Sequence, residues 1–536
     1  MKKRLNLIIL AAILLVAFCL RFYKLGQVPM ALSQDETSIG YNAYSILQTG
    51  KDEYGKVRPL YFKAFGEYKS PVYIYLTAIS IKLFGLNAYA VRFPSAFFGV
   101  LTVLIIYFLV KEIFCNSQLA LLSGLFLAFN PWHLHYSRTA FEVTIAVFLT
   151  TFGWLMLLKK RSFLGITALL LSIFSYNISR ILAPLLLLIF YGNQKHWRKG
   201  LIYAALIFFL PLLFSLKNIS SVKGPMLMTS PEVLANGLEL RSYVMSFSPL
   251  LAKIFFNRFF FAGWLYLNNL ASFISAGFFF ITGSTHGNQG IGNFGQFYLF
   301  ELPLIAFALF KIISKKEKQF YSLIYWSLAV IGVVSLTQEV PHANRALYLV
   351  IPLVIFSAHG LSMLFNKISI FFKLGFFMLV TYSLTFYFLS YYYRFPVLYA
   401  PSWRTADKEA ALYIKNNQDN FNKIIIDQDS GFIYTSLLFY NRFSPQEFQE
   451  TSQRQPDDAE GFSRVKSFGK YEFRPIDWQK DYQPGVLLIA KATDSLPSNL
   501  KISKTFFYPT RPVVLVKNGE IFNYPVTEKA YAAITP

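Results

Sequence analysis

Long apolar runs recur along the first 390 residues, and no other feature restricts the fold of this chain as strongly. A helix that crosses a bilayer needs about 20 mostly apolar residues. With 54% hydrophobic and 15% charged residues and a mean hydropathy of +0.41, the composition is that of a membrane protein. We therefore expect a polytopic α-helical membrane protein with about eleven transmembrane helices. The predicted spans are 5–22, 94–111, 119–136, 141–158, 163–178, 181–192, 200–216, 297–313, 319–336, 346–364 and 370–390.

The basic residues predict how these spans are oriented. Met1-Lys2-Lys3-Arg4 precedes the first run, and every second short loop is basic. Lys and Arg concentrate in cytoplasmic loops. We therefore expect a protein of the cell membrane whose N-terminus lies in the cytoplasm. Eleven spans then put the C-terminus on the opposite, extracytoplasmic side. The formal net charge is +23, and much of the positive charge lies in these short loops, so we exclude a nucleic-acid-binding surface. The basic loops contain Lys111, Lys159 to Arg161, Lys195 to Lys199, Lys315 to Lys318, and Lys367.

Three long segments are predicted to lie outside. The first, 23–93, includes an amphipathic stretch and an apolar stretch, 72–84, which is too short to cross a bilayer and favours the interface. The second, 217–296, is aromatic-rich and ends in a glycine-rich run from Gly283 to Gly295 that cannot form a regular helix. We expect interfacial helices followed by a loop over the membrane.

The third external segment, 395–536, is more polar and predicts a soluble α/β domain of ordinary size. The expected domains are therefore a membrane domain, 1–394, and an extracytoplasmic domain, 395–536. The patterns that indicate regular structure are a helix at 403–416 and buried strands at 423–427, 485–490 and 513–516.

Two cysteines, Cys19 and Cys115, give neither a disulfide framework nor a zinc site. The first apolar run lacks a small-residue cleavage site, so we expect an uncleaved span. The sequence has no nucleotide-binding motif and no convincing metal motif. A divalent metal remains possible as a cofactor. An external enzyme without a nucleotide site needs an activated substrate carried by a lipid.

Adjacent carboxylates, Asp35 and Glu36, directly follow the first span. Ser33-x-x-Glu36 is typical of a capping box that opens a helix, and Gly50 would close that helix. Capping explains Glu36 without requiring Asp35, although an acidic residue also suits a first helical turn. A carboxylate held at the outer bilayer surface could instead accept a proton from a hydroxyl. Capping and catalysis both remain open for this pair.

Several external cations have two interpretations each. Lys69, in Glu67-Tyr68-Lys69-Ser70-Pro71, could bind a phosphate or snorkel from an interfacial helix. Arg92 has the same alternatives. Arg138 could bind a phosphate or pair with Glu142 four residues on.

Two histidines are further candidates. His342 lies in the same external stretch as Arg345, and these two residues could face a phosphate or anchor their loop. His286, in the glycine-rich run, is a candidate substrate contact.

Together these stretches resemble the GT-C superfamily of membrane glycosyltransferases, especially the protein mannosyltransferases and the aminoarabinose (lipid A) transferases. The resemblance covers about residues 1–390 and is strongest over 20–140; the C-terminal domain does not share it. The matching motifs are Asp35-Glu36 with Tyr41 and Tyr44, Lys69-Ser70-Pro71-Val72-Tyr73, Ala90-Val91-Arg92-Phe93-Pro94, Pro131 with Tyr136-Ser137-Arg138, and His342-Ala343-Asn344-Arg345. This chain has Lys-Ser-Pro where the family usually has a pair of prolines.

The resemblance implies inverting transfer of a sugar from a polyprenyl-phosphate donor at the outer face. The acceptor would be a protein, a lipid or a cell-envelope glycan. Asp35 would act as base or position the acceptor, with Glu36 in support. Lys69, Arg138 and Arg345 would stabilise the departing lipid phosphate. Possible substrate contacts are Tyr41, Glu67, Arg92, Glu142, His286 and His342.

Two other classes of protein are alternatives to this reading of the sequence. A transporter or lipid flippase would place ionisable residues at mid-membrane and show internal repeats, and neither pattern is found. A non-catalytic assembly protein would use the C-terminal domain as its binding module.

Overall fold

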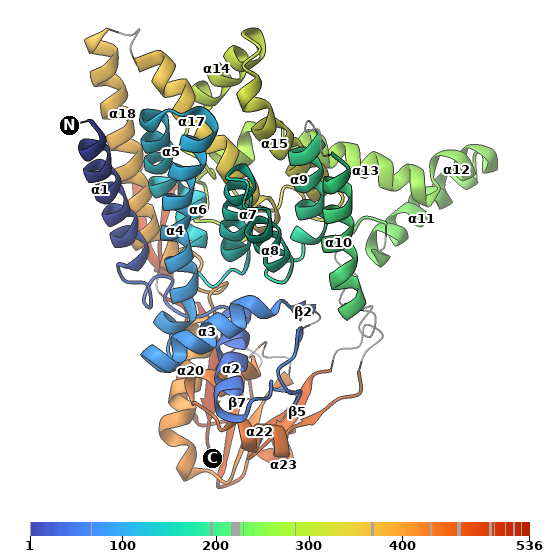
Figure 1. Ribbon diagram of the computed structural model, residues 1–536. Helices are drawn as coiled ribbons and strands as arrows, with labels where there is room; N and C mark the ends of the chain where they lie inside the picture. The colour runs from blue at the N-terminus through green and yellow to red at the C-terminus, as the bar shows by residue number, and fades with distance from the viewer. Residues whose placement is uncertain are drawn as a thin grey trace. The chain divides into compact units, whose positions relative to one another are not determined.

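The computed structural model forms two compact units (Figure 1). The helical unit comprises residues 1–23 and 95–387, and the α/β unit comprises residues 24–94 and 388–536. All residues are described except 1, 66, 193–196, 216–225, 229, 285, 366–368, 429–430, 432, 458–462, 493–495, 498, 510, 518–519 and 527. Only the backbone is described for residues 2, 67, 210–215, 231–232, 511–517 and 520–526. The predicted basic positions Lys195 and Lys367 lie outside the described residues.

Helices make up nearly all regular structure of the helical unit. Each predicted apolar run is helical over most of its length. The helices are α1 (Lys2–Phe22), α4 (Ala88–Phe114, which continues from the α/β unit), α5 (Ser117–Phe129), α6 (Pro131–Tyr136), α7 (Val143–Leu158), α8 (Ser162–Ile173), α9 (Ser179–Gly192), α10 (Trp197–Ser215), α11 (Pro231–Met245), α12 (Pro249–Phe255), α13 (Arg258–Ser272), α14 (Glu301–Ser314), α15 (Tyr321–Ser335), α16 (Ala343–Ala346), α17 (Val350–Phe365) and α18 (Ile370–Leu389).

Length and hydropathy single out fewer crossings than the eleven predicted. Within the described residues, four helical segments can cross a membrane: Lys3–Phe22, Ala88–Phe114, Ala343–Phe365 and Ile370–Leu398. The bent pair α12 and α13 would make five. Several other apolar helices have only 10–17 residues. The chain is thus a multi-pass helical membrane protein, and the number of its crossings stays a prediction.

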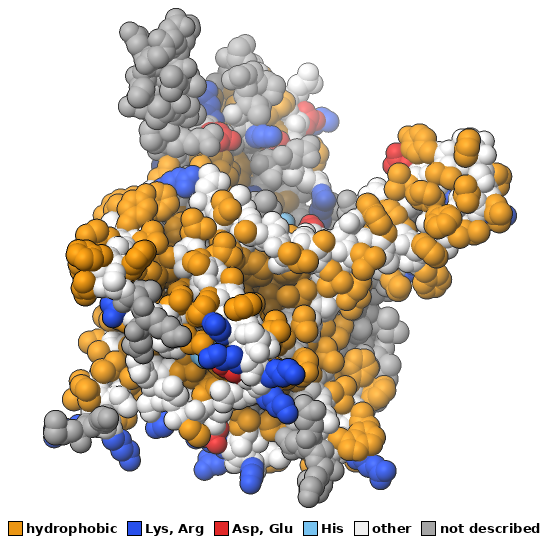
Figure 2. All heavy atoms as spheres, turned by 90° about the horizontal axis from the view of Figure 1, so that it is seen from above, with side chains coloured by type: hydrophobic (Ala, Val, Ile, Leu, Met, Phe, Trp, Pro, Cys, Tyr) orange, Lys and Arg blue, Asp and Glu red, His pale blue; other side chains and the backbone are white. Residues whose placement is uncertain are grey.

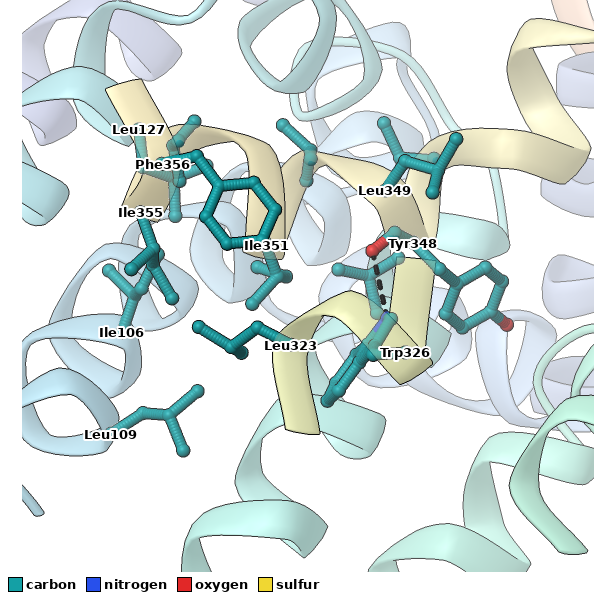
Figure 3. Close-up of a cluster of buried hydrophobic side chains, with 14 of the residues drawn as sticks. Ile106, Leu109, Leu127, Leu323, Trp326, Tyr348, Leu349, Ile351, Ile355 and Phe356 are labelled. Carbon is teal, nitrogen blue, oxygen red and sulfur yellow. Dashed lines mark hydrogen bonds between the residues drawn. The ribbon is translucent and has the colours of Figure 1, made fainter. Parts of the chain in front are cut away.

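The core of the helical unit is apolar and tightly packed (Figure 3). Ile106 and Leu109 of α4 lie with Leu323 of α15 and Ile355 of α17, all fully buried. The indole nitrogen of buried Trp326 donates to the Tyr348 carbonyl at 3.1 Å, so its only polar atom is satisfied.

Glycine allows α14 and α17 to approach closely. A Cβ at Gly360 would lie 2.1 Å from the carbonyl oxygen of Leu304. In a bilayer the hydrophobic effect does not drive helices together, so association depends on close packing. Small residues at the crossing point allow that packing.

The first half of the α/β unit contains α2 (Gln34–Thr49), β1 (Phe62–Ala64), β2 (Glu67–Lys69) and α3 (Pro71–Phe84). The predicted capping box is confirmed: Ser33 Oγ accepts from the Glu36 amide at 3.3 Å, and Glu36 Oε2 accepts from the Ser33 amide at 3.0 Å. The helix ends at Gly50, whose φ of 70° is in the left-handed region that glycine tolerates best.

The second half contains a seven-stranded mixed sheet in the order β4-β5-β6-β3-β7-β11-β8, with β3 parallel to both of its neighbours. The predicted helix and three strands correspond to α20, β3, β7 and β9. Strand β9 pairs with β10 in a separate hairpin. The elements are α19 (Phe395–Leu398), α20 (Thr405–Asn417), β3 (Lys423–Ile426), α21 (Tyr434–Tyr440), α22 (Pro445–Thr451), β4 (Gln453–Arg454), β5 (Val465–Phe468), β6 (Tyr471–Phe473), α23 (Trp478–Asp481), β7 (Val486–Lys491), β8 (Ile502–Phe507), β9 (Arg511–Lys517), β10 (Glu520–Val526) and β11 (Lys529–Ile534).

The division of the chain differs from the predicted boundary at residue 394. The segment 24–94 belongs with the C-terminal residues rather than with the membrane helices. The reason is the buried face of α2, which packs on α21 and α22. Tyr41 lies fully buried in that core, 5.9 Å from Phe448 between ring centroids.

Candidate active site

An ion pair brings together two of the predicted site residues, Asp35 and Lys69. The Lys69 ammonium donates to Asp35 Oδ1 at 2.8 Å. Asp35 is placed by the first turn of α2, and Lys69 by the end of β2, where it pairs with Phe62 of β1. The two side chains differ in burial: 47% of Asp35 is exposed, but only 3% of Lys69. An accessible carboxylate thus lies in contact with a cation that is buried in the protein.

A second ion pair lies one residue along α2. Glu36 and Arg92 are both buried, with Arg92 Nε 2.9 Å from Glu36 Oε1 and Nη2 3.0 Å from Oε2. The remaining Arg92 protons go to backbone carbonyls at 2.6–3.2 Å. A guanidinium has five N–H donors, and all five are used inside the protein. These carbonyls belong to Leu25, Pro29 and Ala31.

This saturation changes the expected role of Arg92. We predicted it as a possible substrate contact, but it has neither exposed surface nor a spare donor. It instead ties the chain that enters α2 to the start of α4. Glu36 is likewise occupied by the capping box and Arg92.

Two other predicted contacts of the α/β unit lie elsewhere. Tyr41 is a core residue with no exposed surface; its hydroxyl donates to the Phe443 carbonyl at 3.3 Å. Burial and nearby Glu53 raise the pKa of Tyr41, so its hydroxyl stays protonated. Glu67 starts β2 opposite Ala64, and its side chain lies outside the described part of the chain.

Buried arginines in the helical unit donate hydrogen bonds to the last carbonyl groups of helices. Arg138 has no exposed surface and donates from Nη1 to the carbonyls of Leu20, at 2.8 Å, and Arg21, at 3.1 Å. Arg21 in turn donates to Leu127 and Ala128 at the end of α5. Terminal carbonyls of a helix carry partial negative charge, which favours cations there. The structure therefore gives Arg138 a helix-capping role in place of a surface position suited to a phosphate. Glu142 immediately precedes α7.

The other predicted residues of the helical unit form one polar cluster. The ring centroids of His286 and His342 are 5.4 Å apart, and His286 Nε2 is 3.7 Å from a carboxylate oxygen of Glu339. Gln289 Nε2 lies 3.1 Å from His342 Nε2. Arg345 donates to Thr337 Oγ1 at 3.1 Å and is half-buried.

His342 is neutral in this cluster. Its Nδ1 accepts from the Arg345 amide at 3.5 Å and caps α16. Burial and the charge of Arg345 lower the pKa of His342 to about 3. A ring protonated at Nδ1 could not accept this hydrogen bond. His342 must therefore be neutral to cap α16.

Sequence reasoning missed two sets of partners. The first set is Arg21, at the end of the first apolar run, and His133; both are buried, and Arg21 Nη2 lies 2.8 Å from His133 Nδ1. Glu53 is buried, accepting from the Tyr434 hydroxyl at 2.7 Å and from Arg454 at 3.3 Å. No local pattern signals partners 400 residues away. Among the described residues, no three His, Cys, Asp or Glu side chains are arranged to hold a metal ion.

Comparisons with known proteins agree with the fold. Residues 68–216 match the family model of the dolichyl-phosphate-mannose-protein mannosyltransferases. The chain resembles the crystal structure of ArnT from Cupriavidus metallidurans bound to undecaprenyl phosphate, with 12% identity, a TM-score of 0.54, and coverage of 98% of this chain and 97% of ArnT. The apo form of ArnT gives 11% identity, a TM-score of 0.53, and coverage of 99% and 98%.

A weaker likeness is to the oligosaccharyltransferase AglB from Archaeoglobus fulgidus, with 16% identity, a TM-score of 0.48 and 82% of this chain covered. This chain spans 64% of the length of that protein. No curated protein sequence matches the chain. Residues 68–216 thus match a glycosyltransferase family model, and the chain as a whole shares the fold of ArnT.

Proposed function

We propose that this chain transfers a sugar from a polyprenyl-phosphate donor to an acceptor at the extracytoplasmic face of the membrane, with inversion at the anomeric carbon. The observation that carries the proposal is the Asp35–Lys69 pair, a half-exposed carboxylate 2.8 Å from a buried ammonium. The lipid donor is supported by the family model over residues 68–216, which includes Lys69.

The proposed chemistry uses both members of the pair. The acceptor oxygen forms a bond to the anomeric carbon while the bond from that carbon to the phosphate oxygen breaks, and the lipid phosphate leaves with the electron pair. An acceptor hydroxyl gives its proton to Asp35; a phosphate acceptor has no proton to give, and Asp35 then positions it. The leaving phosphate gains negative charge, which a fixed cation such as Lys69 stabilises.

The remaining predicted residues divide by accessibility. Arg345 and His286, both half-buried in the helical unit, stay candidates for phosphate contact and substrate contact; His342 stays a candidate for substrate contact only through a change at its site, since it is buried and caps α16. Arg92, Tyr41 and Arg138 are buried among protein partners, and we propose no direct contact for them. The proposed acceptor is a protein, a lipid or a cell-envelope glycan.

The test is Asp35→Asn, assayed for transfer from a polyprenyl-phosphate sugar in the full-length protein. A positioned base contributes about 10²–10⁴-fold, so a loss in that range is expected with a hydroxyl acceptor. The matched control is Asp457→Asn, which breaks the exposed Lys63–Asp457 pair of the same unit, 3.0 Å long, and should leave the rate unchanged. Equal rates for the two variants would refute the role of Asp35.

A further inference from the structure

Three consecutive helices of the helical unit, α11 to α13, form an arm that extends away from the neighbouring helices (Figure 1). Both ends of this arm, residues 226–272, are attached at one place. At its start, the Leu227 amide donates to the Leu336 carbonyl at 2.9 Å. Near its end, Asn269 Nδ2 donates to the carbonyls of Ser335 and Thr337, each at 3.0 Å. The arm therefore leaves and returns at the C-terminal end of α15.

The arm exposes many large apolar side chains. Figure 2 shows hydrophobic side chains spread over the projecting arm on the face in view. Exposed fractions reach 87% for Phe247, 71% for Phe259 and 57% for Trp264. The inner side is apolar too, because Phe261 packs against Gly237 of α11. A protein surface in water does not keep so large an apolar patch uncovered.

Helix lengths exclude a simple crossing by this arm. Helix α11 has 15 residues, about 22 Å at 1.5 Å per residue, which is shorter than the roughly 30 Å of hydrocarbon. Helices α12 and α13 are bent by 54°. Both ends of the arm meet at one end of α15. If α12 and α13 crossed the membrane in one direction, α11 would therefore have to cross it in the other.

The polar residues of the arm fit a lipid headgroup layer. Its cations are Arg241, Lys253 and Arg258, and the amphipathic rings of Tyr243 and Trp264 suit the boundary between headgroups and acyl chains. Amphipathic helices of this composition lie about 5–10 Å into that boundary.

We infer that the α11–α13 arm is a re-entrant membrane anchor, inserted into a single leaflet of the bilayer on the side where α15 ends. The occupant of its apolar surface is lipid. This inference does not depend on the proposed sugar transfer.

The first test measures depth in the full-length protein in phosphatidylcholine vesicles. Cys19 and Cys115, both exposed, are replaced by serine, and single cysteines at Phe259 and Trp264 carry nitroxide labels. Leu379 of α18, 47% exposed, is the lipid control, and exposed Lys466 of β5 is the water control. We expect the ratio of oxygen to nickel-chelate collision at 259 and 264 to exceed that at 466 several-fold and to approach that at 379. A ratio equal to that at 466, or dipolar broadening between copies, would overturn the inference.

The second test measures sidedness. A cysteine at Phe247, between α11 and α12, is exposed to a membrane-impermeant maleimide from either face of the vesicle. The α/β unit follows two predicted crossings after α15, so Lys466→Cys reports the side on which α15 ends. We expect reaction at 247 only from that side, or from neither. Reaction from the opposite side would show that the arm crosses.

Discussion

The two ion pairs of α2 start one residue apart but occupy different surroundings. Glu36 and Arg92 are buried, and every Arg92 donor is used within the protein. Asp35 is about half exposed, and its partner Lys69 is buried. The first pair is a structural clamp on the entry to α2, whereas the second leaves a carboxylate accessible. Of two neighbouring acidic residues, one is therefore fixed in a buried clamp and the other is accessible for the chemistry that we propose.

The clamp gives the largest expected effect. Arg92→Ala would leave the Glu36 carboxylate buried without its guanidinium, and breaking such a pair costs about 3–5 kcal/mol. We expect the apparent midpoint of thermal unfolding in detergent to fall sharply. Arg464→Ala, which removes an exposed arginine of the same unit, should leave the midpoint unchanged. An unchanged midpoint for Arg92→Ala would remove the distinction between the two pairs.

The accessible pair should show the opposite behaviour. Lys69→Met keeps the buried aliphatic stem but removes the ammonium, so we expect transfer to slow by about 10²–10³-fold without loss of fold. The matched control is Lys63→Met on the neighbouring strand β1, whose partner Asp457 is exposed. Initial rates together with unfolding midpoints separate the two effects. A Lys69→Met protein that unfolds but keeps its rate per folded molecule would assign Lys69 to structure.

Asp407 sharpens the comparison because it is a buried carboxylate whose hydrogen-bond donors, a hydroxyl and a backbone amide, are neutral. It is buried and accepts from the Tyr531 hydroxyl at 2.7 Å and the Ile433 amide at 3.2 Å. Burial raises the pKa of Asp407 from 3.8 to about 6. The folded state therefore holds this proton over a range where the unfolded state has lost it, so stability falls as pH rises from about 4 to about 6, by up to ~3 kcal/mol.

Asp407→Asn should remove this part of the pH dependence. The measurement is the unfolding midpoint of wild type and variant between pH 4 and pH 7. The variant should gain stability relative to wild type as pH rises through this range. A constant difference between the two proteins would show that Asp407 titrates normally.

The smallest expected effect comes from a substitution that shifts α2 but leaves both ion pairs, Glu36–Arg92 and Asp35–Lys69, in place. A Cβ at Gly40 would lie 2.5 Å from the Phe439 ring and 2.9 Å from Val91, so Gly40→Ala overpacks the interface. Such changes cost about 1–3 kcal/mol. Gly263→Ala, where nothing lies within 4 Å, is the control. We expect a lower midpoint with unchanged activity per folded molecule; lost activity at an unchanged midpoint would mean that α2 itself moves in the reaction.

Local patterns in the sequence predicted what depends on local physics. The apolar runs, the Ser33–Glu36 capping box and the strands of the C-terminal sheet follow from periodicity, hydropathy and capping chemistry, and the structure confirms them as regular elements. The pair of carboxylates was also visible, together with the reason why capping explains Glu36 and not Asp35.

The partners of these residues could not be predicted in the same way. Tyr41 contacts residues about 400 positions later, and Arg92 takes its carbonyls from an irregular stretch with no periodic signal. A buried arginine and an exposed arginine are the same letter in a sequence. Only the packing of α2 on α21 and α22 decides that Tyr41 is a core residue and that the first external segment joins the C-terminal sheet.

The α/β unit is built from two segments, 24–94 and 388–536, and this has a consequence for biosynthesis. Its sheet is completed only by β11, near the end of the chain, between β7 and β8. At synthesis rates of about 5–20 residues per second, the roughly 290 residues between the two segments take on the order of 15–60 s to make. During that time α2, which carries Asp35, and the β1–β2 hairpin, which carries Lys69, have left the ribosome without the C-terminal half of their unit. The N-terminal segment must therefore wait in an incomplete state, so truncated chains should accumulate in the membrane without a finished site.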